Sequence, residues 1–222
     1  MISGIVHVLK SGGRWADAPA DGLRYVRPVT WVERQLERLR SLNPLAVDGV
    51  LAAVFTAMAM SLLMRLRLAF PGSSYAWLEA IFPQGAPDGV MTPEFYLAML
   101  TMHGTIMVFM VLTTAPQGGF GNYILPIQIG AADMAFPILN MLSFWTTFAS
   151  FVVLIGAFFV QGGAPIAGWT GYPPLSALNS AAVEGYGQDM WILSIALFCI
   201  ASLLGALNFI VTTLHLRTKG MT

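Results

Sequence analysis

The sequence predicts an all-α integral membrane protein with four transmembrane helices. Hydrophobic residues make up 56% of the 222 residues and charged residues only 10%, and the mean hydropathy is +0.70. A soluble chain of this length needs more polar surface than this composition supplies. Four apolar runs are also long enough to cross the hydrocarbon core, which takes roughly 20 residues in a helix. These runs are 44–67, 94–116, 138–161 and 190–214.

Three of the four runs begin at a helix start signal. Asn43 precedes Pro44 in the first run, and Thr92 precedes Pro93 in the second. A polar cap followed by proline suits a helix start, because the missing N–H of proline would have no partner there. The fourth run opens at Asp189, which we expect to cap it.

Basic residues flank the first and last runs and predict the orientation. Seven of them precede the first run, and Arg217 and Lys219 follow the fourth. Both termini are therefore expected on the inner side of the membrane. This orientation places the expected loop 117–137 inside and the loops around 68–93 and 162–189 outside. Many glycines and prolines suit irregular backbone over 72–91 and around 162–171.

Residues 1–43 form a polar, basic extension on the inner side, with no short apolar stretch of the kind found in a cleaved signal peptide. Within it, residues 30–40 fit either an amphipathic helix on the membrane surface or a solvated helical lead-in. Basic and acidic residues balance at 11 each, so the chain has no overall basic field to attract nucleic acid. The single cysteine, Cys199, lies in an apolar run and is expected to be a small packing residue.

His103 is an ionisable residue inside the second run. It lies about 13 Å from the expected helix start at 1.5 Å per residue, in the outer half of the bilayer. Ionisable groups at that depth usually serve a function, although a lone histidine in a helix is often only a hydrogen-bonded structural residue. Gly104 beside it removes a side chain, and neighbouring methionines give a polarizable surface on which a flat cofactor would fit. From the residues alone, haem ligation and a structural role both remain open.

Several motifs closely resemble subunit I of haem–copper oxidases of the cytochrome c oxidase type. The resemblance covers 44–222 in unbroken order and implies that the four runs are part of a twelve-helix bundle. The motifs are MHGTIM at 102–107, GGFGNY at 118–123, GAADMAFP at 130–137, GWTGYPPLS at 168–176 and LGALNF at 204–209.

The resemblance implies that three residues contact cofactors. His103 matches an axial ligand of the low-spin haem, expected to be haem A, and imidazole holds iron in both redox states. Arg65 matches an arginine that hydrogen-bonds a polar substituent of the same haem, where the alternative is a snorkelling arginine. Trp169 matches a tryptophan that donates its indole N–H to a propionate of the high-spin haem, where the alternative is an interfacial aromatic residue.

The resemblance also implies a proton pathway. Asp133 matches the entrance of the family's D pathway, and the basic residues independently place its loop on the side of proton uptake. Taken singly, the polar residues inward of it would be caps or packing residues. Together they match side chains that line a file of water along which protons move. These residues are Asn122, Asn140, Asn208, Ser143 and Ser202.

The chain departs from the family pattern at several positions. Arg67 replaces a glutamate that helps to bind a structural calcium or sodium ion, so no such ion is expected through this residue. Ile138 replaces an arginine near the proton entrance. The positions that match a quinone-binding cluster lack its charge, which favours cytochrome c over a quinol as electron donor and leaves the quinol-oxidising alternative open. They are Thr56, Met60, Phe95 and Ala98.

The resemblance places the second low-spin haem ligand, the high-spin haem ligand and the copper ligands beyond residue 222. We expect a separate polypeptide to carry the remaining subunit I helices, and the alternative is that this sequence is part of a longer chain. Other oxidase subunits, including the copper-bearing subunit II, are expected partners. The predicted function is that of the amino-terminal portion of the catalytic subunit of a proton-pumping terminal oxidase. Its membrane would be a respiratory one, either bacterial plasma or mitochondrial inner membrane, and a non-catalytic membrane scaffold is the other functional class considered.

Overall fold

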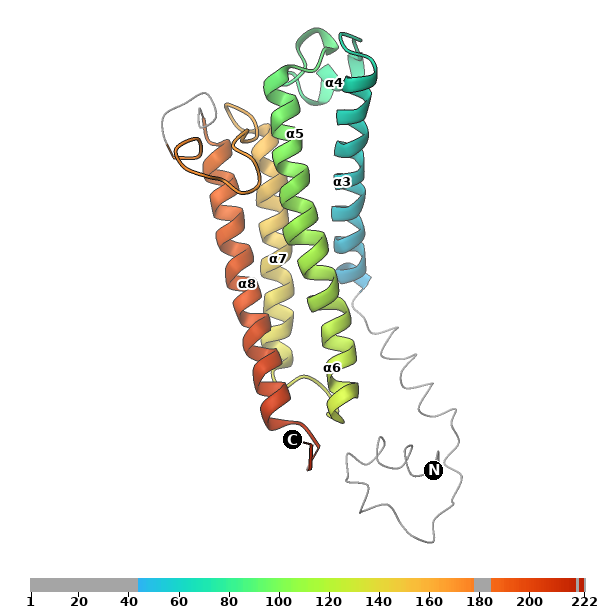
Figure 1. Ribbon diagram of the computed structural model, residues 1–222, viewed down its shortest axis with the longest axis vertical. Helices are drawn as coiled ribbons and strands as arrows, with labels where there is room; N and C mark the ends of the chain where they lie inside the picture. Colours follow the sequence, from blue (N-terminus) through green and yellow to red (C-terminus); the bar gives the residue numbers. More distant parts are fainter. Residues whose placement is uncertain (1–43, 178–184, 219, 222) are drawn as a thin grey trace, which may run out of the picture.

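The computed structural model describes residues 44–177, 185–218 and 220–221, and every regular element among them is helical. Four long helical stretches stand side by side (Figure 1). Each is long and apolar enough to cross a membrane, which confirms the predicted fold class. The whole extension 1–43, including 30–40 and the proposed cap Asn43, lies outside the described residues.

The four spans run antiparallel, so the beginning of the first and the end of the last lie at the same end of the bundle (Figure 1). The long helices are α3 (Pro44–Ala69), α5 (Pro93–Thr105), α7 (Pro137–Gly156) and α8 (Gly187–His215). Short helical turns lie at the opposite end, which we call the outer end. They are α4 (Ala76–Ile81), η2 (Pro87–Gly89) and η5 (Ala157–Phe159). The sequence predicted irregular backbone over 72–91, whereas α4 and η2 form short helical turns within this loop.

The second span is longer than the sequence predicted. Helical backbone continues from α5 through η3 (Ile106–Thr113), η4 (Ala115–Gly121) and α6 (Asn122–Ile129), so the predicted loop 117–137 is reduced to a turn at 130–136. The segments η3 and η4 are π-helical, with hydrogen bonds five residues apart. The hydroxyls of Thr113 and Thr114 donate to carbonyls five residues earlier. Wide turns supported in this way continue through the glycines and Pro116, which had suggested a loop.

One of the testable helix starts is confirmed and one is wrong. Thr92 caps α5, since its hydroxyl accepts a hydrogen bond from the backbone N–H of Phe95 at 3.2 Å. Asp189 does not cap α8. The helix begins two residues earlier at Gly187. Asp189 lies within its first turn, where the negative carboxylate interacts favourably with the helix dipole.

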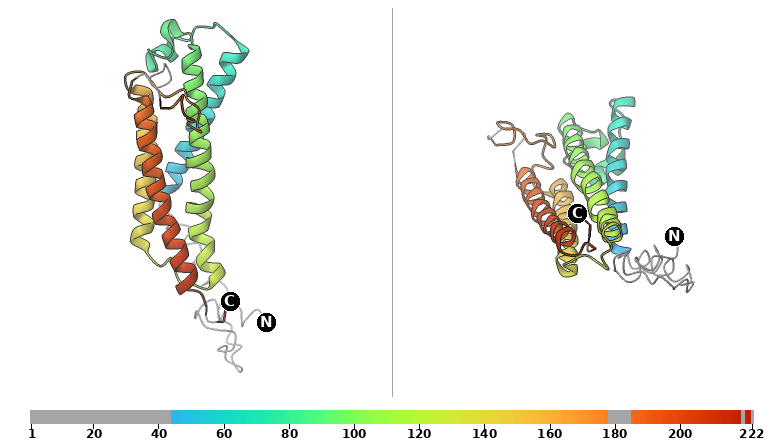
Figure 2. Two further views of the ribbon diagram at one scale, coloured as in Figure 1. Left: turned by 60° about the vertical axis from the view of Figure 1, so that its left-hand side comes forward. Right: turned by 60° about the horizontal axis from the view of Figure 1, so that its bottom comes forward.

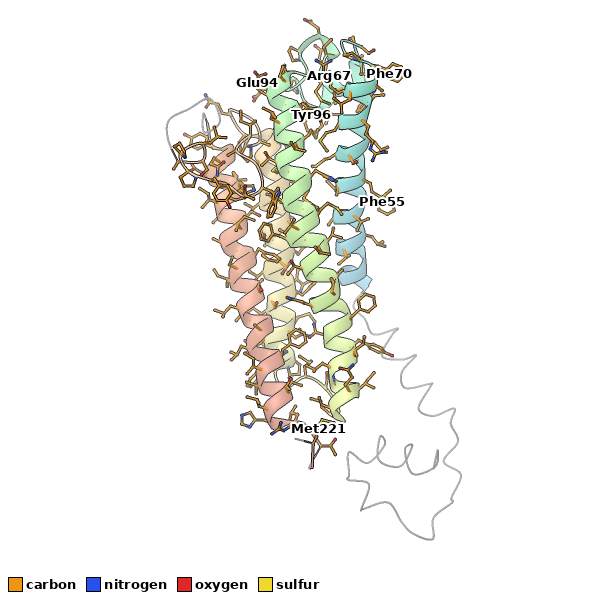
Figure 3. The ribbon with its side chains drawn as sticks, viewed as in Figure 1. Phe55, Arg67, Phe70, Glu94, Tyr96 and Met221 are labelled. Carbon is orange, nitrogen blue, oxygen red and sulfur yellow. The ribbon has the colours of Figure 1, made fainter. Side chains whose placement is uncertain are left out.

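The spans pack as two pairs, α3 with the α5 span and α7 with α8, and both views of Figure 2 keep these pairs together. Methionines fill much of the contact between α3 and α5, including Met60, Met64, Met99 and Met102. The opposite face of α3 is exposed and apolar, and Phe55 points away from the bundle (Figure 3). An apolar outer surface is what lipid or further helices require.

Candidate functional site

The imidazole of His103 is fixed by a backbone carbonyl on the neighbouring span. Its Nδ1 lies 2.9 Å from the carbonyl oxygen of Ala57 in α3. Because a carbonyl oxygen only accepts hydrogen bonds, Nδ1 must carry the hydrogen, and the lone pair of the neutral ring is on Nε2. Ala57 is fully buried and His103 is half-buried. This hydrogen bond therefore sets both the tautomer and the orientation of the ring.

This arrangement fits a haem ligand. Histidines that bind metals almost always donate their other ring N–H to a carbonyl or carboxylate, which raises the basicity of the coordinating nitrogen. On either side of His103 along α5, Met99, Met102 and Ile106 are fully buried and apolar. The donor chemistry at Nε2 is thus the kind that haem iron takes.

Trp169 lies against the backbone of α5 beside His103. A Cβ atom at position 104 would come within 2.8 Å of Cδ1 of Trp169, so only glycine lets the indole ring approach this closely. Phe109 makes an edge contact with the same ring at a centroid distance of 6.5 Å. The space beside Gly104, which the sequence had suggested for a cofactor, is therefore filled by the Trp169 side chain.

The indole of Trp169 is held but not hydrogen-bonded. The side chain is 43% exposed, and its N–H has no partner within the described residues. The loop that carries it is fixed to α5 by Thr101, whose hydroxyl accepts from the backbone N–H of Gly168 at 3.0 Å. Thr105 accepts at 2.9 Å from the indole N–H of Trp191 in α8. Sequence reasoning missed both threonines and Trp191, although Thr101 and Thr105 flank His103 at helical spacing.

Arg65 lies on a different face of α3 from Ala57. It is eight residues further on, about 80° around the helix at 100° per residue. It is exposed and has no hydrogen-bond or ion-pair partner in the described part of the chain, and the exposed Leu62 lies about 60° away on the same side of the helix. Arg67 is half-buried near the outer end of α3 (Figure 3).

At the other end of the bundle, three consecutive backbone N–H groups bind side-chain oxygens. Asp133 Oδ1 accepts from Met134 at 2.7 Å, Thr212 Oγ1 accepts from Ala135 at 2.9 Å, and Asn208 Oδ1 accepts from Phe136 at 2.9 Å. Asn208 also donates to the carbonyl of Phe136 at 3.2 Å. This fully buried amide therefore fastens the turn before α7 onto α8. Asp133 itself is exposed, as an inlet requires.

The remaining polar residues of the expected pathway have mixed surroundings. Asn122 donates to the carbonyl of Gly118 at 2.6 Å, whereas its Oδ1 is buried without a partner. Ser143 donates to the carbonyl of Ala201 at 2.7 Å across the α7–α8 interface. Asn140 is half-buried and Ser202 exposed, and neither side chain has a hydrogen-bond partner within the described residues. Thr212 was missed by sequence analysis, although its position four residues after Asn208 places it on the same face of α8.

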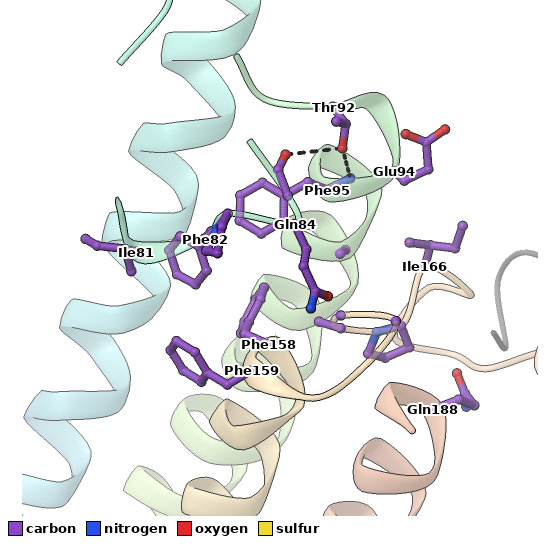
Figure 4. Close-up of a pocket in the computed structure, with 17 residues that line it drawn as sticks. Ile81, Phe82, Gln84, Thr92, Glu94, Phe95, Phe158, Phe159, Ile166 and Gln188 are labelled. Carbon is purple, nitrogen blue, oxygen red and sulfur yellow. Dashed lines mark hydrogen bonds between the residues drawn. The ribbon is translucent and has the colours of Figure 1, made fainter. Parts of the chain in front are cut away.

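A separate pocket of about 360 Å³ lies at the outer end, between the start of α5 and the end of α7 (Figure 4). Phenylalanine rings form much of its wall, and Gln188 contributes a buried amide oxygen without a partner. Phe95 and Ala98, two of the positions that match the quinone cluster, line it. The other two, Met60 and Thr56, are not among the residues that line it.

The four-span bundle, with a histidine fixed inside it and an exposed carboxylate at one end, is that of an integral membrane protein. The chain belongs to the family described as cytochrome c and quinol oxidase polypeptide I, whose model matches residues 47–222. It corresponds to the amino-terminal part of haem–copper oxidase subunit I.

Several curated relatives are named as subunit 1 of cytochrome c oxidases. The alternative cytochrome c oxidase subunit 1 of Bradyrhizobium diazoefficiens is 43% identical over 166 residues, or 75% of this chain and 26% of that protein. Cytochrome c oxidase subunit 1 of Synechocystis is 46% identical over 155 residues, 68% of this chain and 26% of the relative. The Eremothecium gossypii protein of that name is 42% identical over 164 residues, 74% of this chain and 28% of the relative. The chain thus spans about a quarter of the length of the relatives it matches.

Proposed function

We propose that this chain supplies the amino-terminal part of the catalytic subunit of a proton-pumping terminal oxidase, with His103 as one axial ligand of its low-spin haem. The observation that carries the proposal is the hydrogen bond from His103 Nδ1 to Ala57, which leaves Nε2 as the coordinating atom. The haem would supply a one-electron carrier at this position. The protein would hold the imidazole in one orientation and surround it with methionine-rich packing.

Arg65 and Trp169 are the proposed contacts to haem substituents. Both side chains are exposed and lack hydrogen-bond partners in the described part of the chain, so each has donors available for an anionic or polar group. Arg65 would bind a polar substituent of the low-spin haem, expected to be haem A. Trp169 would donate to a propionate of the high-spin haem. The ligands of that haem and of copper would come from sequence outside these 222 residues.

Asp133 is the proposed proton inlet, at the end of the bundle where the described chain ends. Its carboxylate is exposed, and the turn that carries it is fastened to α8 by Asn208 and Thr212. A fixed turn keeps the carboxylate at one place relative to the α7–α8 interface, across which Ser143 donates to Ala201. Asn140 on α7 and Ser202 on α8 are the further proposed members of the pathway. Asn122, with its unpartnered Oδ1, is the proposed water-binding group on α6.

The proposed setting is a respiratory membrane, with both termini on the inner side. The proposed partners are the remaining subunit I helices, the copper-bearing subunit II and cytochrome c as electron donor. A quinol donor is the second candidate, supported by the apolar pocket that Phe95 and Ala98 line. Oxidation of reduced cytochrome c and of a quinol by the purified complex separates the two donors.

The test is a reduced-minus-oxidised optical spectrum of the purified complex. We expect a low-spin haem band that is lost in His103→Ala and retained in His215→Ala, a control at the exposed inner end of α8. A complex without this band would support a non-catalytic scaffold. A band that survives His103→Ala would remove His103 as the ligand.

A further inference from the structure

Thr101 and Thr105 form a paired attachment between α5 and the outer part of the bundle. They are four residues apart, so they share one face of the helix, and they are 2% and 0% exposed. His103 lies between them in sequence, about 200° around the helix from each, which places it on the opposite face toward α3. The same helical turn therefore carries the proposed haem ligand on one side and the two hydroxyls on the other.

Each hydroxyl has its direction fixed by a second hydrogen bond. Thr101 donates to the carbonyl of Leu97 at 3.0 Å, and Thr105 donates to the carbonyl of Thr101 at 2.8 Å. With the hydrogen used inside the helix, each oxygen presents a lone pair outward as an acceptor. Gly168 N–H and the Trp191 indole N–H fill these two acceptor positions. A valine of the same shape cannot replace either hydroxyl.

The two attachments hold both ends of the turn that carries Trp169. At one end, Gly168 binds Thr101. At the other, the Trp191 ring packs on Gly171, where a Cβ would lie 3.1 Å from Cη2 of the ring. A hydrogen bond of 3.1 Å from the N–H of Gly171 to the carbonyl of Gly168 closes the turn. Trp169 lies between these points and rests on Gly104.

We infer that Thr101 and Thr105 are positioning residues that hold Trp169 against Gly104, the residue after the proposed haem ligand, and thereby set the hydrogen bond that its indole donates to a haem propionate. The inference rests on the proposed function for the propionate, but the attachment itself does not depend on it. A donor on a propionate spreads the carboxylate's negative charge, which otherwise favours ferric iron. Release of Trp169 should therefore lower the midpoint potential of the high-spin haem.

The experiment compares Thr101→Val, Thr105→Val and Trp191→Phe in the purified oxidase complex. Trp191→Phe removes the indole donor together with the outer ring atoms, Cη2 and Cζ3, that lie on Gly171. Thr101→Ser and Thr105→Ser keep the hydroxyl and should behave as the parent. Thr146→Val is the matched control, because that hydroxyl bonds only to Leu142 within its own helix.

Two measurements are made on each variant. Hydrogen exchange over 165–173 should be roughly fivefold faster in Thr101→Val, the change expected for loss of one hydrogen bond. The midpoint potential of the high-spin haem should fall in all three disrupting variants and recover in the serine variants, with the low-spin haem band unchanged. Unchanged exchange would overturn the attachment. Faster exchange with an unchanged midpoint potential of the high-spin haem would overturn the positioning role. Failure of the proposed haem ligation is distinguished from this result, because it would appear as a low-spin haem band that survives in His103→Ala.

Discussion

The side chain of His103 and the backbone of Ala57, 46 residues apart in the sequence, are joined by a hydrogen bond of 2.9 Å across two membrane spans. No side chain on α3 is needed for this contact, because the carbonyl of a helical residue supplies the acceptor. The proposed haem ligand on α5 is therefore oriented by α3, the span that also carries Arg65. Changes in the packing of α3 against α5 should therefore alter the orientation of the His103 ring.

Replacing His103 by methionine tests the ligand without removing coordination. Methionine sulfur can still bind haem iron, and pairing it with histidine raises the reduction potential relative to two histidines. We expect His103→Met to keep a low-spin haem with a higher midpoint potential, measured by spectroelectrochemical titration. His215→Met, at the exposed inner end of α8, should leave the potential at the parent value. Equal potentials in parent and His103→Met would argue against ligation by this residue.

Gly104→Ala tests the contact between α5 and Trp169. The added Cβ would lie 2.8 Å from the indole Cδ1, so the ring or the helix must shift. Overpacking of this kind costs about 1–3 kcal/mol, and we expect a lower melting temperature for the purified complex. Gly119→Ala is the control, because nothing lies within 4 Å of a Cβ there. Equal melting temperatures for the two variants would mean that Trp169 does not rest on Gly104.

Some features of the fold could be predicted from sequence because they depend on local patterns. The apolar length of each run predicted the four spans, and the Thr92–Pro93 pair predicted the start of α5. The length of the second span could not be predicted, because glycine and proline at 116–121 normally favour a loop. Wide π-helical turns, with the hydroxyls of Thr113 and Thr114 bonded five residues back, continue the helix through them.

The candidate site was predicted only in part, for a related reason. Motif resemblance pointed to His103 and Asp133 individually. The partners that fix them are a backbone carbonyl at Ala57 and the hydroxyl of Thr212, which holds the turn that carries Asp133. Every residue has a backbone carbonyl, so the sequence does not show which one accepts the hydrogen bond. A threonine in an apolar helix usually bonds to its own helix. Such contacts depend on which helices meet, and the order of residues along one helix does not reveal that.

Asp133→Asn tests the proton inlet. An amide keeps the size of the side chain but cannot release a proton, so proton uptake should become the slow step of turnover. We expect slower oxygen consumption and slower proton uptake by the purified enzyme, with the haem spectrum unchanged. Asp88→Asn, in an outer-end turn, is the control. Unaltered uptake in Asp133→Asn would exclude Asp133 as the entrance.

Asn208→Ala tests the attachment of the same turn to α8. It leaves the backbone N–H of Phe136 without its partner, whereas the Phe136 carbonyl keeps the hydrogen bond from the N–H of Asn140. An unsatisfied buried donor costs roughly 1–3 kcal/mol. We expect a lower melting temperature together with slower proton uptake, because the turn that carries Asp133 is loosened. Thr213→Val, whose hydroxyl bonds only to Phe209 in its own helix, should change neither. Slower uptake with an unchanged melting temperature would instead mark Asn208 as a direct part of the proton path.

Ser150 and Ser194 offer a test of how α7 and α8 are joined. The pair is fully buried, and each hydroxyl donates to the backbone carbonyl of the other residue, at 2.7 and 2.8 Å. Because the two hydroxyl oxygens also lie 3.1 Å apart, each single change disturbs the other hydroxyl, and Ser150→Ala and Ser194→Ala should not be additive. Polar contacts between membrane helices have coupling free energies of about 0.6 kcal/mol, so the double variant should be less destabilised than the sum of the singles by roughly this amount. The measurement is the free energy of unfolding of the purified complex in a denaturing-detergent titration, with Thr147→Ala as the control because its hydroxyl bonds within α7. Strict additivity would show that the two serines stabilise the helices independently.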